Sequence, residues 1–315
     1  MQVSYIEQPI FLVGAERSGT TLLRLMLSHH SQLAWCNEFE YSVDLISDGN
    51  FPQLDVYYSW LETHRIFQAT NFKIDRDLNY YQLINSFFIQ KQVREGKPLV
   101  GATVHRHFDR LLQIWPKAKF IHIVRDGRDV ARSCIGMGWA GNVWTGVERW
   151  IESENLWADL SQSLSAWQKT EVTYESLISH PQDVLEDLCN FLEISFEPQM
   201  LTYDRTTSYD LPNPKLIHQW KYKLSDLEIQ LIESRIAGML QERNYELSNL
   251  PSIQVTPVIV QKLKLQDWLK RIQFRINRLG LRLFLADNLS RRLQLNSWQK
   301  NIKLKINDVQ RTYLK

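Results

Sequence analysis

Apolar runs and amphipathic segments alternate along the first 192 residues of the chain. Short apolar runs predict buried strands at 9–15 (PIFLVGA), 33–36, 99–104, 119–124 and 171–174. Apolar residues at helical spacing predict helices at 20–30, 107–114, 126–137, 144–167 and 181–192, with two or three more within 52–95. Strands that alternate with helices favour a parallel sheet covered on both faces. The expected fold class is therefore α/β.

Composition narrows the class of protein. The chain has 315 residues, of which 44% are hydrophobic and 23% charged, which excludes a disordered chain, a disulfide miniprotein and a collagen-like repeat. Three widely spaced cysteines (Cys36, Cys134, Cys189) favour a reducing compartment over a disulfide framework or a zinc site. There is no secretory signal pattern and no apolar run of about 18 residues. We expect a cytoplasmic protein, with a peripheral place on a membrane left open.

Charge divides the chain into two parts. Residues 251–315 hold 14 Lys and Arg against Asp267, Asp287 and Asp308, a net charge of +11, so residues 1–250 carry −9 of the overall +2. Prolines break the pattern near 249–257. We expect one domain at 1–250 and a basic helical extension at 251–315.

The extension has the pattern of an amphipathic helix. Its apolar positions are Leu265, Trp268, Leu269, Ile272, Ile276, Leu279 and Leu283, and its neighbouring basic stripe is Lys264, Arg271, Arg275, Arg278 and Arg282. Packing of the apolar stripe on the acidic domain is the favoured interpretation. An anionic membrane surface or an anionic acceptor such as a polysaccharide stays open. Nucleic acid is not expected as a partner, because no recognised binding module is present.

The first strand leads into a glycine-rich turn. The stretch Gly14-Ala15-Glu16-Arg17-Ser18-Gly19-Thr20-Thr21 has two glycines five residues apart, a strand before it and a helix after it, which is the pattern of a loop that surrounds a phosphate with backbone N–H groups. In nucleoside triphosphatases a lysine follows the second glycine. Here that residue is Thr20 and the positive charge sits at Arg17, which favours a smaller phosphate group without an Mg²⁺ clamp. A turn whose glycines serve only the backbone is the alternative.

A second candidate site follows the strand at 119–124. Residues 120–133 read FIHIVRDGRDVARS, which places Arg125 at the carboxyl end of a strand, where ligands of open α/β sheets bind. Asp126 can cap the next helix, and Ser133 offers a hydroxyl two turns later. Arginine suits bidentate phosphate binding because its donors form a planar fork. A surface turn in which the arginines pair with Asp126 and Asp129 is the alternative.

Together these two motifs resemble those of the sulfotransferase superfamily, whose donor is 3′-phosphoadenosine 5′-phosphosulfate (PAPS), and most closely its tyrosylprotein and bacterial branches. The resemblance covers residues 8–247 and implies a P-loop-type fold of three layers, a central parallel sheet flanked by helices. It implies that the loop binds the 5′-phosphosulfate through Arg17, Ser18, Gly19, Thr20 and Thr21. It also implies that Arg125 and Ser133 bind the 3′-phosphate, with Tyr174 beside the nucleotide and Lys221 in a late segment that covers the donor.

Catalytic roles follow from the same resemblance. The tyrosylprotein branch has a glutamate base about twenty residues after the loop arginine, and counting without gaps reaches Glu38. A solvated helix start at Glu38 or Glu40 is the alternative. The lysine that many members carry near 101–107 is missing, so His105 or Arg106 is expected to take its place, while Arg17 faces the sulfuryl group.

We therefore expect a PAPS-dependent sulfotransferase that transfers a sulfuryl group to a hydroxyl or amine of an unidentified acceptor, with no metal. A phosphoryl-transfer enzyme is the first rival, and Thr20 stands against it. A nucleotide-binding scaffold without catalysis is the second, and the missing lysine favours it.

Overall fold

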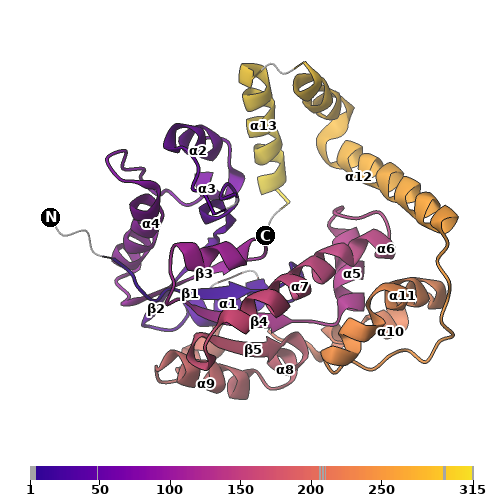
Figure 1. Cartoon of the computed structure of the whole chain (residues 1–315), viewed down its shortest axis with the longest axis horizontal. Coiled ribbons are helices and arrows are strands. Elements are labelled where there is room, and N and C mark those ends of the chain that lie inside the picture. The colour runs from indigo at the N-terminus through magenta and orange to yellow at the C-terminus, as the bar shows by residue number, and fades with distance from the viewer. Residues whose placement is uncertain are drawn as a thin grey trace.

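A five-stranded parallel sheet forms the centre of the molecule (Figure 1). The computed structural model describes residues 5–47, 49–205, 207, 209, 211–293 and 296–313. The strands lie in the order β2-β3-β1-β4-β5, and every neighbouring pair is parallel. Their bounds are β1 (Ile10–Val13), β2 (Leu33–Glu38), β3 (Leu99–Val104), β4 (Lys119–Val124) and β5 (Lys169–Thr173). This sheet confirms the expected α/β class.

Helices cover both faces of the sheet, as the continuous burial of its central strands requires. On β1, Phe11 and Val13 pack in one apolar cluster, while Ile10 and Leu12 pack in another on the opposite face. The first cluster joins the sheet to α2 (Leu54–Leu61), α3 (Arg65–Gln68), α4 (Tyr80–Glu95) and α7 (Glu148–Ser163). The second joins it to α1 (Thr20–Ser28), α8 (Tyr174–Ser179) and α9 (Pro181–Leu192). The result is the expected three-layer arrangement.

A third apolar cluster lies beside the carboxyl ends of the strands. It joins α5 (Gly127–Gly136), α6 (Val143–Gly146), α7 and α11 (Asp226–Glu242) around the buried ring of Trp150. Short α10 (Trp220–Lys223) leads into α11. This cluster holds the segment that follows β4 against the rest of the domain.

The segment expected as one helix over 144–167 is two helices, α6 and α7, so that prediction was wrong in its extent. Asn142 caps α6, because its side chain accepts from the backbone N–H of Thr145. Gly146 lies against the backbone of α5, where a β-carbon would come 2.5 Å from the carbonyl oxygen of Ala131. Helix α7 then ends at Ser163, and β5 begins at Lys169, two residues before the expected strand.

The C-terminal residues form two further helices, α12 (Pro257–Arg292) and α13 (Asn296–Arg311), as Figure 1 shows. Helix α12 bends at Gly280, whose φ of 75° is not helical. It contacts α6, and α13 returns to α2 and α3, where Asn307 donates to the carbonyl of Thr63 at 3.1 Å and Lys300 pairs with Glu62. Among the described helices, none combines the length and apolar character needed to cross a bilayer.

The packing expected of the apolar stripe on α12 was wrong for its first three members, whereas Ile272, Ile276, Leu279 and Leu283 are half-buried. Leu265, Trp268 and Leu269 are exposed. The face of α12 that carries Asp267 contacts the domain instead, because the Asp267 carboxylate accepts from the N–H of Gly141 at 2.6 Å and from the Thr145 hydroxyl at 2.7 Å. These two hydrogen bonds, with the packing of Leu263 in the third apolar cluster, set the rotation of the helix.

Candidate active site

The loop between β1 and α1 has the backbone geometry of an anion-binding turn. Gly14, Arg17 and Gly19 have φ values of 142°, 75° and 94°. No side chain fits at Gly19, because a β-carbon there would lie 2.3 Å from the ring of Tyr174. Alternation of left-handed and right-handed residues turns successive N–H groups toward one point, next to the N-terminus of α1. The turn is thus built for a phosphate-sized anion.

The two arginine motifs, far apart in sequence, meet at this loop. The Arg17 Nε–H donates to the Ser133 hydroxyl oxygen at 2.9 Å, and an Arg125 Nη1–H donates to the carbonyl oxygen of Arg17 at 3.2 Å. The Arg125 guanidinium lies over the Tyr174 ring, 4.2 Å from its centre. Arg17, Ser133, Arg125 and Tyr174 therefore form one continuous surface, which is the juxtaposition that binding of a single nucleotide requires.

Two buried polar atoms at this surface lack a partner in the described part of the chain. They are the Ser18 hydroxyl oxygen and Arg125 Nε. Burial of an unpaired polar group costs about 1–3 kcal/mol, so such atoms are typical of a site that a ligand completes. Thr21 lies next along α1, half-buried. These donors fit phosphate oxygens, which accept hydrogen bonds only.

Glu38 stands at the carboxyl end of β2, where the pairing with β3 shifts register between Cys36 and Glu38. Its side chain is half exposed, and its carboxylate lies 4.0 Å from Arg65 of α3. Burial on its inner side raises the pKa of Glu38, and the charge of Glu40 raises it further. A carboxyl that is accessible and has a raised pKa suits a general base.

Glu40 is the residue that sequence reasoning left out of the site. It is buried, and its Oε1 accepts from the His105 backbone N–H at 3.0 Å and from His105 Nδ1 at 2.7 Å. His105 Nε2 in turn lies 3.1 Å from the Thr20 hydroxyl, so a chain of three side chains ends at the phosphate loop. The acidic stretch NEFEYS was the only signal, and it does not distinguish Glu40 from its neighbours.

The charges of this pair depend on each other. Burial lowers the pKa of His105, but the hydrogen bond and charge of Glu40 outweigh burial, so the pKa of His105 is raised. Burial raises the pKa of Glu40, but His105 outweighs it and the pKa of Glu40 is lowered. The pair therefore favours an imidazolium beside a carboxylate, which places a positive charge next to the loop.

Two predicted site residues have other surroundings: Arg106 is in an ion pair with another residue, and Lys221 is on the surface. Arg106 makes a bidentate pair with Asp44, at 2.9 and 2.7 Å. Lys221 is exposed in α10, with its Nζ 5.5 Å from the centre of the Trp220 ring. The structure brings neither into contact with the loop residues.

Buried charges hold the second motif in place. Asp126 caps α5, as expected, by accepting from the Arg128 N–H at 2.9 Å, and the Arg128 guanidinium donates to Asp126 and to Glu233 at 2.7 and 2.6 Å. Arg128 also stacks on Trp220, 3.5 Å from its ring centre. Arg128 is therefore a positioning residue. Arg125 also pairs with Asp129 at 3.4 Å, as the alternative expected, and donates to the carbonyl of Leu216 at 2.9 Å, while its Nη1 reaches the loop.

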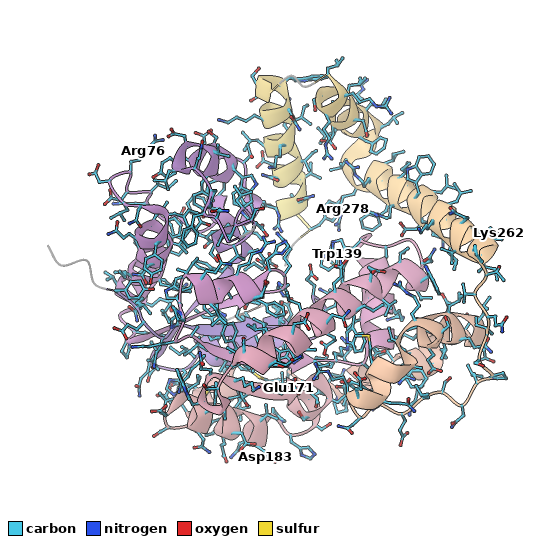
Figure 2. The ribbon with its side chains drawn as sticks, viewed as in Figure 1. Arg76, Trp139, Glu171, Asp183, Lys262 and Arg278 are labelled. Carbon is cyan, nitrogen blue, oxygen red and sulfur yellow. The ribbon has the colours of Figure 1, made fainter. Side chains whose placement is uncertain are left out.

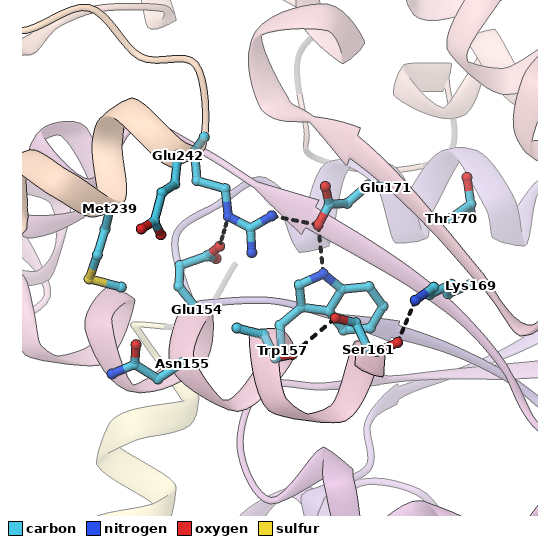
Figure 3. Close-up of a pocket in the computed structure, with 11 residues that line it drawn as sticks. Glu154, Asn155, Trp157, Ser161, Lys169, Thr170, Glu171, Met239 and Glu242 are labelled. Atoms are coloured by element: carbon cyan, nitrogen blue, oxygen red, sulfur yellow. Dashed lines mark hydrogen bonds and ion pairs between the residues drawn. The ribbon is translucent and has the colours of Figure 1, made fainter. Parts of the chain in front are cut away.

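A pocket of about 510 Å³ lies away from this site, between α7, β5 and the end of α11 (Figure 3). Several of its polar side chains pair with one another. The Arg243 guanidinium pairs with Glu154 at 2.8 Å and with Glu171 at 2.7 Å, and Trp157 Nε1–H donates to Glu171 at 2.6 Å. This network joins α7 and α11 to the edge strand.

Comparison with known proteins agrees with the geometry. The profile described as "Sulfotransferase family" matches residues 9–198. Over 213 residues the chain is 24% identical to protein-tyrosine sulfotransferase A of Caenorhabditis elegans, covering 64% of this chain and 54% of that protein. It is 25% identical over 215 residues to an uncharacterized protein of Aquifex aeolicus, 64% of this chain and 27% of that one.

The chain thus spans about half or less of the length of these two relatives. Among solved structures, the sulfotransferase domain from the curacin biosynthetic pathway superposes with a TM-score of 0.56 at 19% identity, over 78% of this chain and all of that domain. This likeness confirms the fold. The family match covers most of residues 1–250 and confirms the resemblance drawn from the two arginine motifs. The chain belongs to the sulfotransferase family.

Proposed function

We propose that this protein transfers a sulfuryl group from PAPS to a hydroxyl or amine of an acceptor. The observation that carries the proposal is the contact between the two arginine motifs, with Arg125 donating to the backbone of Arg17 and stacking on Tyr174. A bisphosphorylated nucleoside presents phosphates at two positions, and this surface offers two separate sets of donors. A triphosphate would instead call for a lysine at the position of Thr20.

The donor would be held by both motifs. Arg17, Ser18 and the backbone N–H groups of Gly19, Thr20 and Thr21 would bind the 5′-phosphosulfate, at the N-terminus of α1. Arg125 and Ser133 would bind the 3′-phosphate. The hydrogen bond that now joins Arg17 to Ser133 shows that these side chains reach one another, so both can turn toward a bound ligand. PAPS supplies the activated sulfuryl group.

Three protein groups would carry the reaction. Glu38 would accept the proton of the acceptor hydroxyl or amine. Arg17 would neutralise the oxygens of the sulfuryl group in transfer. His105, kept as an imidazolium by Glu40, would donate to the leaving phosphate oxygen in place of the missing lysine. Arg106 is the weaker candidate for that task, because Asp44 already binds its guanidinium.

The acceptor class and the compartment complete the proposal. The nematode relative is named a protein-tyrosine sulfotransferase, so tyrosine-containing peptides are the first acceptors to test. We place the protein in the cytoplasm, which is supported by the three cysteines, all free and buried.

Calorimetry and a transfer assay test the proposal. We expect 3′-phosphoadenosine 5′-phosphate to bind at least tenfold more tightly than 5′-AMP or ATP, since a bidentate arginine–phosphate contact contributes about 1.5–3 kcal/mol. With labelled PAPS, Glu38→Gln is expected to abolish transfer to acceptor fractions without weakening nucleotide binding.

Glu62→Gln is the matched control, because its side chain is 52% exposed and paired to Lys300, against 49% for Glu38 paired to Arg65. Equal binding of the three nucleotides would refute the sulfotransferase assignment. Normal nucleotide preference without transfer in the wild type, across hydroxyl and amine acceptors, would favour a nucleotide-binding scaffold.

A further inference from the structure

Helix α12 exposes large apolar side chains in both of its halves. Val258, Leu265, Trp268 and Leu269 are all exposed in its first half. After the bend at Gly280, Leu281, Leu285, Leu289 and Leu293 recur every four residues and are exposed as well. Such a stripe along both halves of one helix is unusual for a surface that meets only water.

The packing of α12 keeps this stripe outward. Asp267 binds Gly141 and Thr145, and residues two positions away on a helix lie roughly 200° around its axis. Leu265 and Leu269 are therefore on the face opposite the domain. Gly138 and Gly141 allow the close approach, since a β-carbon at Gly138 would lie 2.1 Å from the Phe274 ring.

Positive charge surrounds the stripe, while the acids of residues 251–315 are used internally. Asp267 pairs with Arg271, Asp287 with Arg275 and Arg291, and Asp308 with Arg311. The exposed basic residues of α12 are Lys262, Lys264, Lys270, Arg271, Arg282, Arg291 and Arg292. Lys262 lies at the outer edge of the molecule in Figure 2. Helix α12 thus carries nine Lys and Arg against Asp267 and Asp287, a net charge of +7 on the helix that bears the apolar stripe.

We propose that α12 docks the protein on an anionic lipid bilayer. Exposed leucines and a tryptophan flanked by lysines and arginines match a helix that lies in the headgroup region, with its apolar face in the acyl boundary. Charge complementarity favours this occupant over the same helix of a second copy, because two such helices would bring +7 against +7. The fixed rotation of α12 presents the stripe without rearrangement of the catalytic domain.

Vesicle co-sedimentation of the full chain tests the proposal. We expect binding to vesicles of equimolar phosphatidylcholine and phosphatidylserine, and little binding to phosphatidylcholine alone. The variant Trp268→Ser/Leu269→Ser should bind roughly tenfold to hundredfold more weakly, because it removes much of the apolar area that enters the bilayer. The matched control is Trp167→Ser/Leu227→Ser, which removes the same two residue types elsewhere.

The pair is closely matched in exposure: Trp268 and Leu269 are 58% and 52% exposed, and Trp167 and Leu227 are 47% and 59%. Both variants should keep the wild-type thermal unfolding midpoint. Measuring that midpoint distinguishes weaker vesicle binding from loss of folding. Equal binding of the two variants would overturn the proposal, as would wild-type binding that is independent of the anionic lipid. Absence of vesicle binding, with a dimer in sedimentation velocity that Trp268→Ser/Leu269→Ser dissociates, would assign the stripe to a second copy instead.

Discussion

Glu40→Gln separates the charge of Glu40 from its hydrogen bonding. Glutamine keeps the shape and one acceptor oxygen for the His105 N–H groups, but it removes the negative charge 2.7 Å from the imidazole. In the wild type that charge outweighs burial and raises the pKa of His105. Without it, only the charges of Glu16 and Glu38 oppose burial, so the pKa of His105 should fall. The variant should therefore have a neutral His105 at pH values where the wild type has an imidazolium.

The rate follows from that protonation state. Because the pKa of His105 is raised in the folded protein, the imidazolium is complete at low pH and is lost as the pH rises through the folded value. A hydrogen bond from a charged group contributes about 1.5–3 kcal/mol, so loss of the imidazolium should lower kcat by roughly tenfold to hundredfold just above the ordinary histidine pKa of 6.5. The alkaline limb of the kcat profile should move to lower pH.

The assay is the transfer of label from PAPS between about pH 6 and about pH 9, where the histidine changes its charge. Glu38→Gln is the comparison, because loss of the base should lower kcat across the whole range, while residual activity should keep the alkaline limb, which His105 sets, near its wild-type pH. Affinity for the bisphosphorylated nucleotide should be measured for both variants. A Glu40→Gln profile that coincides with the wild type would refute the assignment of His105 as a charged donor.

Further predictions concern the donor site and the ion networks. Arg125→Lys loses the planar fork and should weaken 3′-phosphoadenosine 5′-phosphate roughly tenfold or more in calorimetry while leaving 5′-AMP nearly unchanged. Gly19→Ala should abolish binding of both nucleotides, because the new β-carbon meets the neighbouring tyrosine ring at 2.3 Å. Arg128→Met leaves buried acids unpaired and should cost about 3–5 kcal/mol in urea unfolding, whereas Lys117→Met, in an exposed pair, should have no measurable effect. Burial raises the pKa of Glu171, but the hydrogen bond and charge of His122 outweigh burial and lower that pKa to about 2. The ionised Glu171 therefore stabilises the fold above pH 4.5, its ordinary pKa, and this contribution is lost as the pH falls toward 2. Glu171→Gln should flatten the decline of the thermal unfolding midpoint at acid pH.

The sheet and the two arginine motifs were predictable because their signals are local. A strand, a turn with Gly14 and Gly19, and a helix are contiguous in the chain, and parallel strands place their carboxyl ends at one edge. The meeting of Arg17 with Arg125 follows from that edge, since β1 and β4 are neighbours. Glu40 was not predictable in this way. Its role depends on β2 and β3 ending side by side, so that a residue after one strand reaches His105 after the other.

The exposed stripe of α12 is a second feature whose packing could not be predicted from the sequence. Periodicity reports which residues share a face, and it identified Leu265, Trp268 and Leu269 correctly as one stripe. It cannot report which face meets the domain, because that choice depends on the buried Asp267 carboxylate, on Leu263 in the third apolar cluster, and on the groups of the 138–145 loop that approach them. Unpaired, that carboxylate would be costly in a protein interior, and a few exposed leucines cost little by comparison. A polar anchor can therefore override an apolar stripe when a helix docks, and the stripe left outside becomes the surface on which a partner is to be sought.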